Sequence, residues 1–380
     1  MPIQRPTTAK INLQALRRNL QTVRNRIGET REIFAVVKAN AYGHGAMEVG
    51  RVLQSEGISH FGVATLEEGT ELRRNGITGS ITILGGLLPD QFEGLFEYDL
   101  TPAVYNMEWA ERLSRKAVRH RKTIPVQIKV DTGMGRLGFS AGEAPERIAA
   151  ITDLPGLKIM GVFSHFAFAD LDNPECVQAQ SAALSRIQKT VGEKGISIPF
   201  WHLSNSGAVL AFPSALFNMV RPGIMLYGIA PSEDFSLQEP LAPVLSWETR
   251  IIHLKEVPAG TPLSYGHTFV TGRPSRIATL PVGYADGYPR RLSNRAQVLL
   301  HGHRAPVVGR VTMDMTLIDV TGIHETALGD RVTLLGKDGG EEITAWELAR
   351  WNDSIAYEIL CGIRRRVPRI YHDPSPDRPV

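Results

Sequence analysis

Between Ile33 and Arg221, short apolar runs alternate with longer stretches in which apolar residues recur at helical spacing. The runs are typical of strands buried on both faces, and the longer stretches are typical of amphipathic helices. Strands are predicted at 33–38, 59–64, 81–84, 101–104, 124–130, 157–163, 199–203 and 218–221, with helices such as 106–120 and 174–193 between them. This α/β alternation of eight units indicates a (β/α)8 TIM-type barrel, with its active site at the C-terminal ends of the strands. A doubly wound open sheet is the alternative, but no G-x-G-x-x-G follows the first strand.

Two other regions flank this alternation. At the N-terminus, a short strand around Lys10–Leu13 precedes a helix that Asn12 can cap and that buries Leu13, Leu16, Leu20, Val23 and Ile27. After about Tyr227, prolines mark a linker, and short β-type runs separated by glycine and proline follow. These runs are Thr249–Val257, Arg276–Pro281, Gln297–Leu300, Pro306–Val311, Thr316–Val320, Arg331–Leu335 and Arg366–Ile370, with helices at Ala345–Trp351 and Ile355–Leu360. We expect a barrel over residues 1–238, a C-terminal, mainly β domain over 239–380, and a disordered tail from His372.

Composition limits the function. A chain of 380 residues with 43% hydrophobic residues and a net charge of +3 is predicted to be a soluble protein that does not bind nucleic acid. No apolar run reaches membrane-spanning length, and the first twenty residues do not resemble a signal peptide, so a cytoplasmic location is expected. Cys176 and Cys361 have no ligand-like spacing, and neither a disulfide nor a metal site is expected.

Lys38 is the most unusual residue of the first barrel strand. It ends the apolar run Ile33–Val37 and is followed by a loop punctuated by glycine. A buried ammonium must be paired or must lose its proton, and a lysine with a depressed pKa is the amine that captures an aldehyde cofactor as a Schiff base. Considered alone, a lysine at this position more often extends from the strand end into solvent.

The surrounding motif favours the first interpretation. The sequence Val37-Lys38-Ala39-Asn40-Ala41-Tyr42-Gly43-His44-Gly45 resembles the pyridoxal 5′-phosphate (PLP) lysine motif of alanine racemases. The resemblance implies that Lys38 is the Schiff-base lysine and that Tyr42 binds the cofactor phosphate. It extends over both expected domains, from about Ala9 to about Tyr371.

The last two barrel strands are followed by segments suited to a phosphate. Ser204-Asn205-Ser206-Gly207 and Arg221-Pro222-Gly223-Ile224 offer a hydroxyl at a helix start and backbone N–H groups after a glycine. An ordinary N-cap is the alternative interpretation of the first segment. Both segments are similar to their counterparts in alanine racemases, which implies cofactor contacts from residues including Asn205, Ser206, Gly223, Ile224 and Tyr357.

Two arginines acquire roles through the same resemblance. Arg221 corresponds to the arginine that faces the pyridine nitrogen, where many PLP enzymes have a carboxylate. A permanent cation cannot accept the ring proton, so the ring stays neutral and return of a proton to Cα is favoured over side reactions. Arg136, in the glycine-rich segment Asp131–Gly138, corresponds to the arginine near the cofactor phenolic oxygen and the substrate carboxylate. Lys129 occupies a position at which several family members have a carbamylated lysine.

Racemisation requires a base on each face of the reacting carbon. By resemblance, Lys38 serves one face, and Tyr265 of the segment Ser264–Phe269 serves the other face from a second subunit, so a head-to-tail homodimer is implied. His165, in Phe163-Ser164-His165-Phe166, would hydrogen-bond both Tyr265 and Arg221, although a lone histidine at a strand end is often only structural.

A second-domain loop completes the implied site. Gly309–Asp314 matches a family loop that places Met313 near the substrate carboxylate, although some members have cysteine at the position of Thr312. The access corridor would be lined by Tyr284, Arg290, Arg310 and Asp170.

The resemblance therefore implies an alanine racemase that interconverts L- and D-alanine and supplies D-alanine for cell-wall synthesis. A broad-specificity amino-acid racemase is the nearest alternative. A PLP amino-acid decarboxylase of the same architecture would be expected to place a carboxylate where Arg221 stands, and a non-catalytic PLP carrier would lack the domain that contains Tyr265 and Met313.

Overall fold

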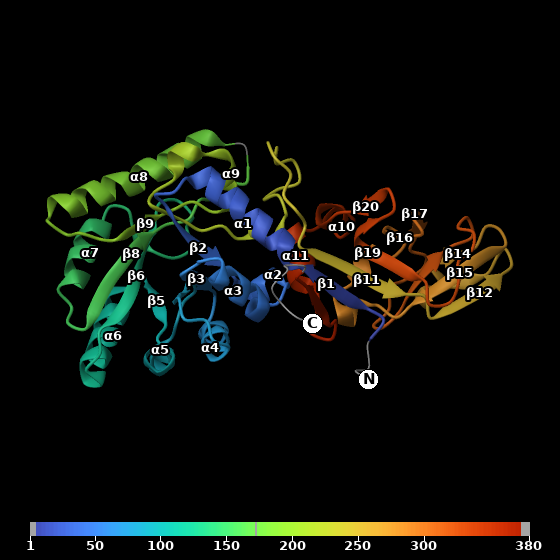
Figure 1. Ribbon diagram of the computed structural model, residues 1–380, viewed down its shortest axis with the longest axis horizontal. Coiled ribbons are helices and arrows are strands. Elements are labelled where there is room, and N and C mark those ends of the chain that lie inside the picture. The colour runs from blue at the N-terminus through green and yellow to red at the C-terminus, as the bar shows by residue number, and fades with distance from the viewer. Residues whose placement is uncertain (1–4, 172, 374–380) are drawn as a thin grey trace. The chain divides into compact units, whose positions relative to one another are not determined.

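The computed structural model describes residues 5–171 and 173–373, and they form two compact units (Figure 1). The barrel unit consists of residues 17–41 and 46–241. The strand-rich unit consists of 242–373 together with two earlier segments, 5–16 and 42–45. The division predicted between residues 238 and 239 assigns 5–16 and 42–45 to the barrel, whereas these segments group with the strand-rich unit.

The barrel unit contains the parallel strands that the apolar runs predict. They pair in the order β10-β2-β3-β4-β5-β6-β8-β9, so the barrel is closed at every edge except that between β9 and β10. A short extra strand, β7 (Phe139–Ser140), pairs with β6. The eight barrel strands are β2 (Glu32–Val36), β3 (His60–Val63), β4 (Ser80–Ile83), β5 (Thr101–Val104), β6 (Ile124–Asp131), β8 (Leu157–Phe163), β9 (Phe200–His202) and β10 (Met219–Val220).

Helices follow the strands and cover the outside of the barrel (Figure 1). Strand side chains such as Phe34, Phe61 and Ile128 are fully buried, as continuous apolar runs predict. The helices are α1 (Leu13–Ile27), α3 (Ala46–Ser55), α4 (Leu66–Arg74), α5 (Phe92–Glu97), α6 (Met107–His120), α7 (Ala144–Thr152), α8 (Pro174–Glu193) and α9 (Ser206–Ala211). The predicted cap of α1 is present, because Asn12 Oδ1 accepts a hydrogen bond from the Ala15 N–H at 3.0 Å.

The segment α2 (Lys38–Tyr42) is a turn of left-handed helix. Ala39, Asn40, Ala41 and Tyr42 have φ values of 53°, 56°, 53° and 52°. This conformation brings Cβ close to the following carbonyl oxygen and costs roughly 1–2 kcal/mol for each residue other than glycine. No local pattern predicts it, because alanine and tyrosine ordinarily favour right-handed backbone.

The strand-rich unit contains three sheets. The largest has the order β17-β16-β19-β11-β1-β21, with β20 paired to β19; β12-β15-β18 and β13-β14 form the others. Strand β1 (Thr8–Asn12) is antiparallel to β11 and parallel to β21. The remaining bounds are β11 (Leu245–Arg250), β12 (His253–Val257), β13 (Pro262–Leu263), β14 (Phe269–Val270), β15 (Ser275–Leu280), β16 (Gln297–Leu300), β17 (His303–Pro306), β18 (Thr316–Asp319), β19 (Arg331–Asp338), β20 (Glu341–Ile343), β21 (Arg369–His372), α10 (Ala345–Trp351) and α11 (Ala356–Gly362).

Three predicted strands of this unit were misplaced. The stretch 249–257, predicted as a single strand, forms two strands, β11 paired with β19 and β12 paired with β15. The change of partner occurs at Ile251 and Ile252. The N–H of Ile251 donates to Asp330 O, and the N–H of Ile252 donates to Thr279 O. The strand predicted at 306–311 lies instead at β17, which ends at Pro306, and Val307 forms only an isolated bridge with Ile318. The last strand begins only after Pro368.

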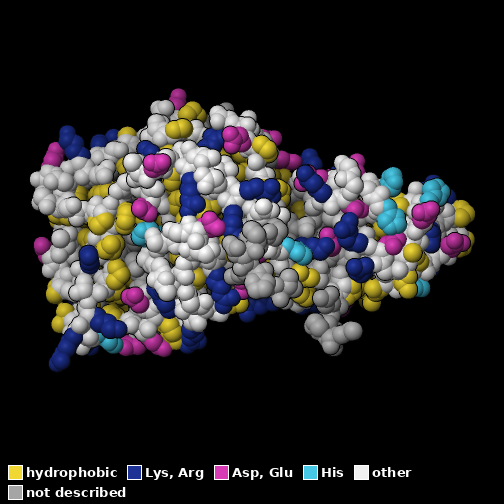
Figure 2. All heavy atoms as spheres, viewed as in Figure 1, with side chains coloured by type: hydrophobic (Ala, Val, Ile, Leu, Met, Phe, Trp, Pro, Cys, Tyr) yellow, Lys and Arg dark blue, Asp and Glu magenta, His cyan; other side chains and the backbone are white. Residues whose placement is uncertain are grey.

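The prediction of disorder is wrong at His372, which belongs to β21, and for residues 374–380 it lies outside the described part. Lys and Arg side chains are interspersed with Asp and Glu on the face shown in Figure 2. Within the described residues, no helix is both long enough and apolar enough to span a membrane.

Candidate active site

The C-terminal ends of the barrel strands bring together the basic residues that the sequence singles out. Lys38 follows β2, Arg136 follows β6, His165 follows β8 and Arg221 follows β10. Lys129 lies within β6, close to its C-terminal end. Ligand sites of (β/α)8 barrels are built at this end of the strands.

Arg221 is the most firmly held of these residues. Its side chain is 4% exposed and donates to Ser164 O (2.6 Å), Leu203 O (3.0 Å), His202 Nδ1 (2.8 Å) and His165 Nδ1 (3.3 Å). Burial lowers the pKa of Arg221 to about 9, so the guanidinium remains protonated at neutral pH. The barrel therefore fixes a permanent cation in one orientation.

His165 is a neutral imidazole at neutral pH. Burial, followed by the positive charges of Arg221, Lys129, Arg136 and Lys38, places its pKa well below the usual value. Because Nδ1 accepts from the arginine, the ring proton is on Nε2, which is therefore a hydrogen-bond donor. Four positively charged side chains therefore lie near this imidazole.

Lys129 is buried in this cationic group. Its Nζ lies 4.6 Å from the centroid of the Phe163 ring. Burial lowers its pKa well below the usual value, and Arg221 and Arg136 lower it further, while Asp131 opposes the shift.

Asp131 shapes the loop that carries Arg136. Its Oδ1 accepts from the backbone N–H groups of Gly133 (2.9 Å), Met134 (2.9 Å) and Gly135 (3.1 Å). Burial by itself would raise the pKa of Asp131, but these hydrogen bonds outweigh it and the pKa is lowered. At Gly138, φ is 133° and an added Cβ would lie 2.4 Å from Asp131 N, so glycine is required where the loop closes.

Ser206 ties together the loops after β9 and β10. Its Oγ accepts from the N–H groups of Gly223 (2.9 Å) and Met225 (3.3 Å), and Asn205 caps α9 through Ala208 N. The segment thus contains both a helix N-cap and a hydroxyl at the strand ends. The N-cap and phosphate-site interpretations therefore do not exclude one another.

Asp170 lies beside the start of α9. Its Oδ1 accepts from Asn205 Nδ2 at 3.4 Å, and an added Cβ on Gly207 would come within 2.5 Å of the same oxygen. Burial raises the pKa of Asp170, and the hydrogen bond from Asn205 partly offsets the rise.

The other predicted site residues belong to the strand-rich unit. Tyr42 and Tyr357 lie with ring centroids 6.1 Å apart. Tyr265 is 73% exposed, and Met313 is 53% exposed. Arg290 and Arg310 line one cavity of about 340 Å³.

Backbone contacts order the loops that carry these residues. Ser264 Oγ, next to Tyr265, donates to Arg310 O at 2.7 Å. The N–H of Tyr284 donates to Thr312 O, and Thr312 Oγ1 in turn bonds to Met315 O and N, which closes the turn that displays Met313. The hydroxyl of Thr312 thus has a structural use in this loop.

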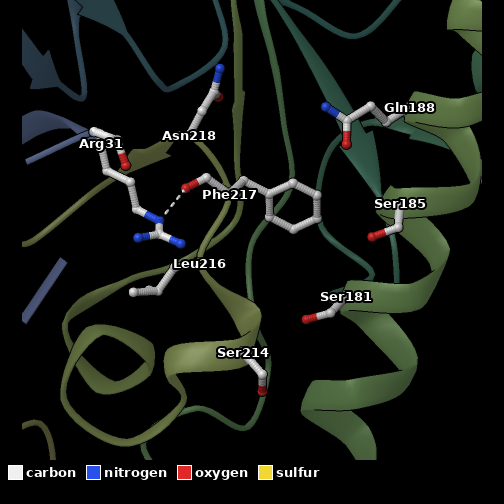
Figure 3. A pocket seen from close by; sticks show the side chains of 9 residues that line it. Arg31, Ser181, Ser185, Gln188, Ser214, Leu216, Phe217 and Asn218 are labelled. Carbon is white, nitrogen blue, oxygen red and sulfur yellow. Dashed lines mark hydrogen bonds between the residues drawn. The ribbon is translucent and has the colours of Figure 1, made fainter. Parts of the chain in front are cut away.

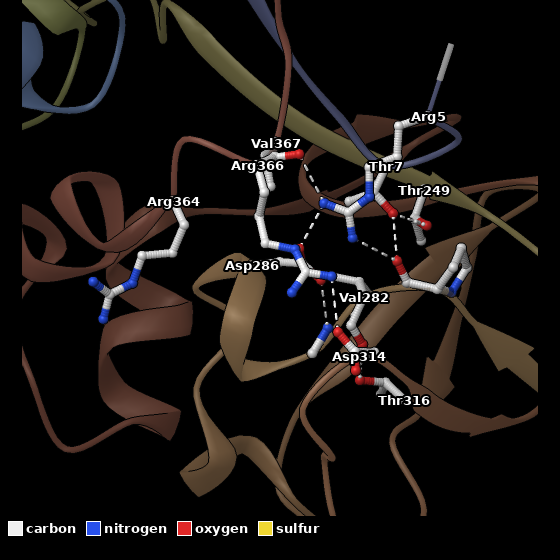
Figure 4. A network of polar contacts seen from close by, with 12 residues as sticks. Arg5, Thr7, Thr249, Val282, Asp286, Asp314, Thr316, Arg364, Arg366 and Val367 are labelled. Atoms are coloured by element: carbon white, nitrogen blue, oxygen red, sulfur yellow. Dashed lines mark hydrogen bonds and ion pairs between the residues drawn. The ribbon is translucent and has the colours of Figure 1, made fainter. Parts of the chain in front are cut away.

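A buried carboxylate that the sequence analysis did not assign supports the same loops (Figure 4). Asp286 is fully buried, and its Oδ1 pairs with Arg5 Nη1 (2.6 Å) and Arg366 Nε (2.9 Å), while Oδ2 accepts from Gly283 N (3.0 Å). Arg366 also pairs with Asp314 at 2.8 Å, directly after Met313. Asp286 lies between the predicted corridor residues Tyr284 and Arg290, but its partners Arg5 and Arg366 are distant in sequence.

A groove of about 430 Å³ lies at the other end of the barrel strands (Figure 3). Arg31 precedes β2, and Phe217 and Asn218 precede β10, so this groove is at the N-terminal ends of the strands. Ser181, Ser185 and Gln188 of α8 line its opposite side. Since barrel active sites form at the C-terminal ends, we place the candidate site away from this groove.

The fold and these residues define a class: a barrel enzyme with a buried, cationic site at its strand ends and a second, strand-rich unit. The sequence matches the family "Alanine racemase, N-terminal domain" over residues 11–231 and "Alanine racemase, C-terminal domain" over 244–371. It is 47% identical over 369 residues to the alanine racemase of Halothermothrix orenii, covering 97% of each chain. The chain belongs to the alanine racemase family, whose members are isomerases.

Solved structures agree. The alanine racemase of Clostridium difficile 630 superposes with a TM-score of 0.93 at 38% identity, covering 98% of this chain and 97% of that one. The Bacillus anthracis enzyme with bound L-Ala-P gives 0.92 at 37% identity, with the same coverage. The Bartonella henselae enzyme with covalently bound pyridoxal phosphate gives 0.87 at 31% identity, covering 97% of this chain and 100% of that one. These likenesses confirm the predicted fold class.

Proposed function

We propose that this enzyme interconverts L- and D-alanine with pyridoxal 5′-phosphate as its cofactor. The observation that carries the proposal is the hydrogen bond between the protonated Arg221 and the neutral His165, set among the cations Lys38, Lys129 and Arg136. Such an excess of positive charge favours ligands that carry phosphate and carboxylate groups. Similar enzymes have been solved with covalently bound pyridoxal phosphate and with L-Ala-P.

The chemistry of the donor set fits this cofactor. Lys38 supplies an amine for the aldehyde, Ser206 a hydroxyl for the phosphate and Arg221 a guanidinium for the ring nitrogen. The residues proposed to hold the cofactor are Lys38, Tyr42, Arg136, His165, Asn205, Ser206, Arg221, Gly223, Ile224 and Tyr357. When bound, pyridoxal phosphate withdraws electrons from the substrate and acidifies its Cα–H bond.

Arg221 limits the reaction to proton exchange in this proposal. A guanidinium bonded to two backbone carbonyl groups and two imidazoles cannot take a proton from the ring nitrogen. Electron withdrawal is then moderate, which favours return of the proton to Cα. The decarboxylase alternative calls for an acidic group at this place and is disfavoured for that reason.

Inversion follows from two bases on opposite faces of Cα. Lys38 exchanges the proton on one face, and Tyr265 of a second subunit exchanges it on the other. His165, with its proton on Nε2, is suited to hydrogen-bond that tyrosine and to link it to Arg221. Exposed Tyr265 and Met313 side chains favour a head-to-tail homodimer in which each site is completed by the other subunit.

The remaining residues bind and admit the substrate. Arg136 and Met313 would hold its carboxylate, and Tyr284, Arg290, Arg310 and Asp170 would line the access corridor. Lys129, with its lowered pKa, can be carbamylated by carbon dioxide, because that reaction consumes an unprotonated amine. A carbamate there would offset the neighbouring arginines. D-Alanine made by the enzyme would serve cell-wall synthesis.

A chiral assay tests the proposal. The purified protein with pyridoxal phosphate is given single L-amino acids (alanine, serine, lysine and arginine), and each D-enantiomer is measured. We expect D-alanine far ahead of the others. Comparable turnover of serine or lysine would indicate a broad-specificity racemase, and inversion of none would overturn the proposal.

A further inference from the structure

The left-handed turn after Lys38 requires support from outside itself. Ala39, Asn40 and Ala41 all have positive φ and ψ, with values for Ala39 of 53° and 48°. Residues with a Cβ leave this conformation for right-handed or extended backbone unless surrounding contacts prevent it. Because Ala39 is bonded directly to Lys38, any such change would redirect the chain at the proposed cofactor lysine.

Glu68 supplies a contact at the critical residue. Its Oε1 accepts from the N–H of Ala39 at 2.7 Å, and its Oε2 accepts from the N–H of Ala64 at 2.7 Å. Ala64 directly follows β3, the neighbour of β2 in the barrel. One carboxylate therefore joins the chain after β2 to the chain after β3, through hydrogen bonds assisted by its charge.

The geometry departs from what the local sequence predicts. Thr65 caps α4, with Oγ1 accepting from Glu68 N, and the T-x-x-E spacing is that of a capping box. In a capping box the glutamate returns to the N–H of the capping residue. Here the carboxylate instead binds the N–H groups of Ala64 and Ala39, which indicates a use beyond helix capping.

Other hydrogen bonds also accompany the turn. The N–H of Ala41 donates to Val37 O at 2.8 Å, and Asn40 Oδ1 accepts from Ala46 N at 2.8 Å. These two are made within the same stretch of chain, whereas Glu68 comes from a separate helix. Glu68 thus ties the turn to a neighbouring element of the barrel.

We propose that Glu68 is a positioning residue that holds the left-handed turn and so aims the Lys38 amine into the site. This inference rests on the proposed role of Lys38 as the cofactor lysine. Glu68 acts through the backbone of Ala39 and takes no part in proton transfer.

The test measures covalent capture of pyridoxal phosphate by the apoprotein. Samples are reduced with borohydride at intervals, and the modified lysine is identified by peptide mass. Glu68→Gln keeps the shape, but its amide nitrogen cannot accept a hydrogen bond, so one contact is lost and the other loses its charge. We expect capture at Lys38 to slow about tenfold, with kcat lowered more than KM changes.

A matched control lies next to it in the chain. Glu67 is exposed in the same first turn of α4, so Glu67→Gln makes the same charge change without touching the turn. This variant should capture the cofactor at the unmodified rate. Equal slowing of both variants would assign the effect to net charge and overturn the inference.

Relief of backbone strain distinguishes a positioning role from a general loss of stability. Ala39→Gly removes the Cβ that opposes the left-handed conformation. In the Glu68→Gln background it should restore much of the capture rate. Failure to restore it, or a wild-type rate in Glu68→Gln alone, overturns the inference.

Two further variants keep the outcomes separate. Glu68→Asp retains the charge, but its side chain is too short to reach both N–H groups. It should therefore also slow the capture of pyridoxal phosphate at Lys38, and it replaces Glu68→Gln if that variant folds poorly. Lys38→Ala should give no modified lysine in the site. Capture at another residue in that variant would refute the role of Lys38 and hence the proposed function, whatever Glu68 does.

Discussion

The candidate residues of the barrel differ from those of the strand-rich unit in how they are held. Arg221 and Lys129 are buried, and Arg221 is bonded on several sides by barrel groups. Tyr265 and Met313 project from turns that are well ordered by backbone contacts, but their side chains face solvent. The barrel therefore carries a preorganised site, whereas the second unit displays side chains suited to complete a site elsewhere.

The largest loss of activity is expected when the barrel lysine, Lys38, is replaced. Lys38→Ala should lower racemisation about 10³-fold or more, because both the cofactor linkage and one base are lost. Chiral analysis of alanine measures the effect. Lys158→Ala, an exposed lysine near the start of β8, is the control and should keep full activity. Activity retained in Lys38→Ala would show that the active site is not the one proposed in the barrel.

The matching change in the strand-rich unit is Tyr265→Phe. Loss of one of two bases should lower racemisation about 10²–10⁴-fold, while capture of pyridoxal phosphate at Lys38 remains unchanged. Activity and borohydride trapping measured on the same preparation separate the two effects. Slower capture of the cofactor would show that Tyr265 also shapes the barrel site, contrary to the division drawn above.

A smaller effect tests whether the strand-rich unit has a rigid support of its own. Asp286→Asn leaves Arg5 and Arg366 without their buried partner and should lower the free energy of unfolding by about 2–4 kcal/mol. Asp353 pairs with Arg291 and Arg295 at the surface, so Asp353→Asn should cost under about 1 kcal/mol. Urea unfolding of both variants gives the difference, and equal costs would contradict a supporting role for Asp286.

The smallest effect is a pH dependence of stability that originates in the barrel. Burial, followed by neighbouring cations, lowers the pKa values of His165 and His202 in the folded state. The unfolded chain then binds more protons below about pH 6.5, so stability is full above that pH and falls as pH decreases. Each histidine contributes a slope of up to about 1.4 kcal/mol per pH unit.

Urea unfolding between about pH 7 and pH 5 measures this slope. His202→Gln should reduce it, while His253→Gln, on an exposed position of β12, should not. A slope unaffected by His202→Gln would mean that the barrel interior is not the source of the acid sensitivity.

Sequence reasoning succeeded where the determining interactions are local. All eight barrel strands and the helix capped by Asn12 follow from apolar runs, helical spacing and a capping residue, which act within a few residues. Sequence reasoning failed at β11 and β12, because the chain passes from one sheet to another there without any break in composition. The position of β1 in the second unit depends on β11 and β21, far along the chain.

The same distinction holds for the site. Arg221 and His165 were identified through the motifs in which they lie, and the structure brings them into contact. Their catalytic roles stay predictions. Glu68, His202 and Asp286 were not identified, because their importance lies in partners far away in sequence.

The pairing of β1 with β21 also bears on the order of events during synthesis. Strand β1 is made before all of the barrel strands, yet one of its neighbours, β21, ends at His372. The barrel strands are all translated before residue 221, so they can associate while the rest of the chain is still being made. The largest sheet of the second unit, in contrast, can be completed only after residue 372 has been translated. A ribosome that stops between residues 241 and 369 would thus release a chain with its barrel segments present and β1 without one of its neighbours.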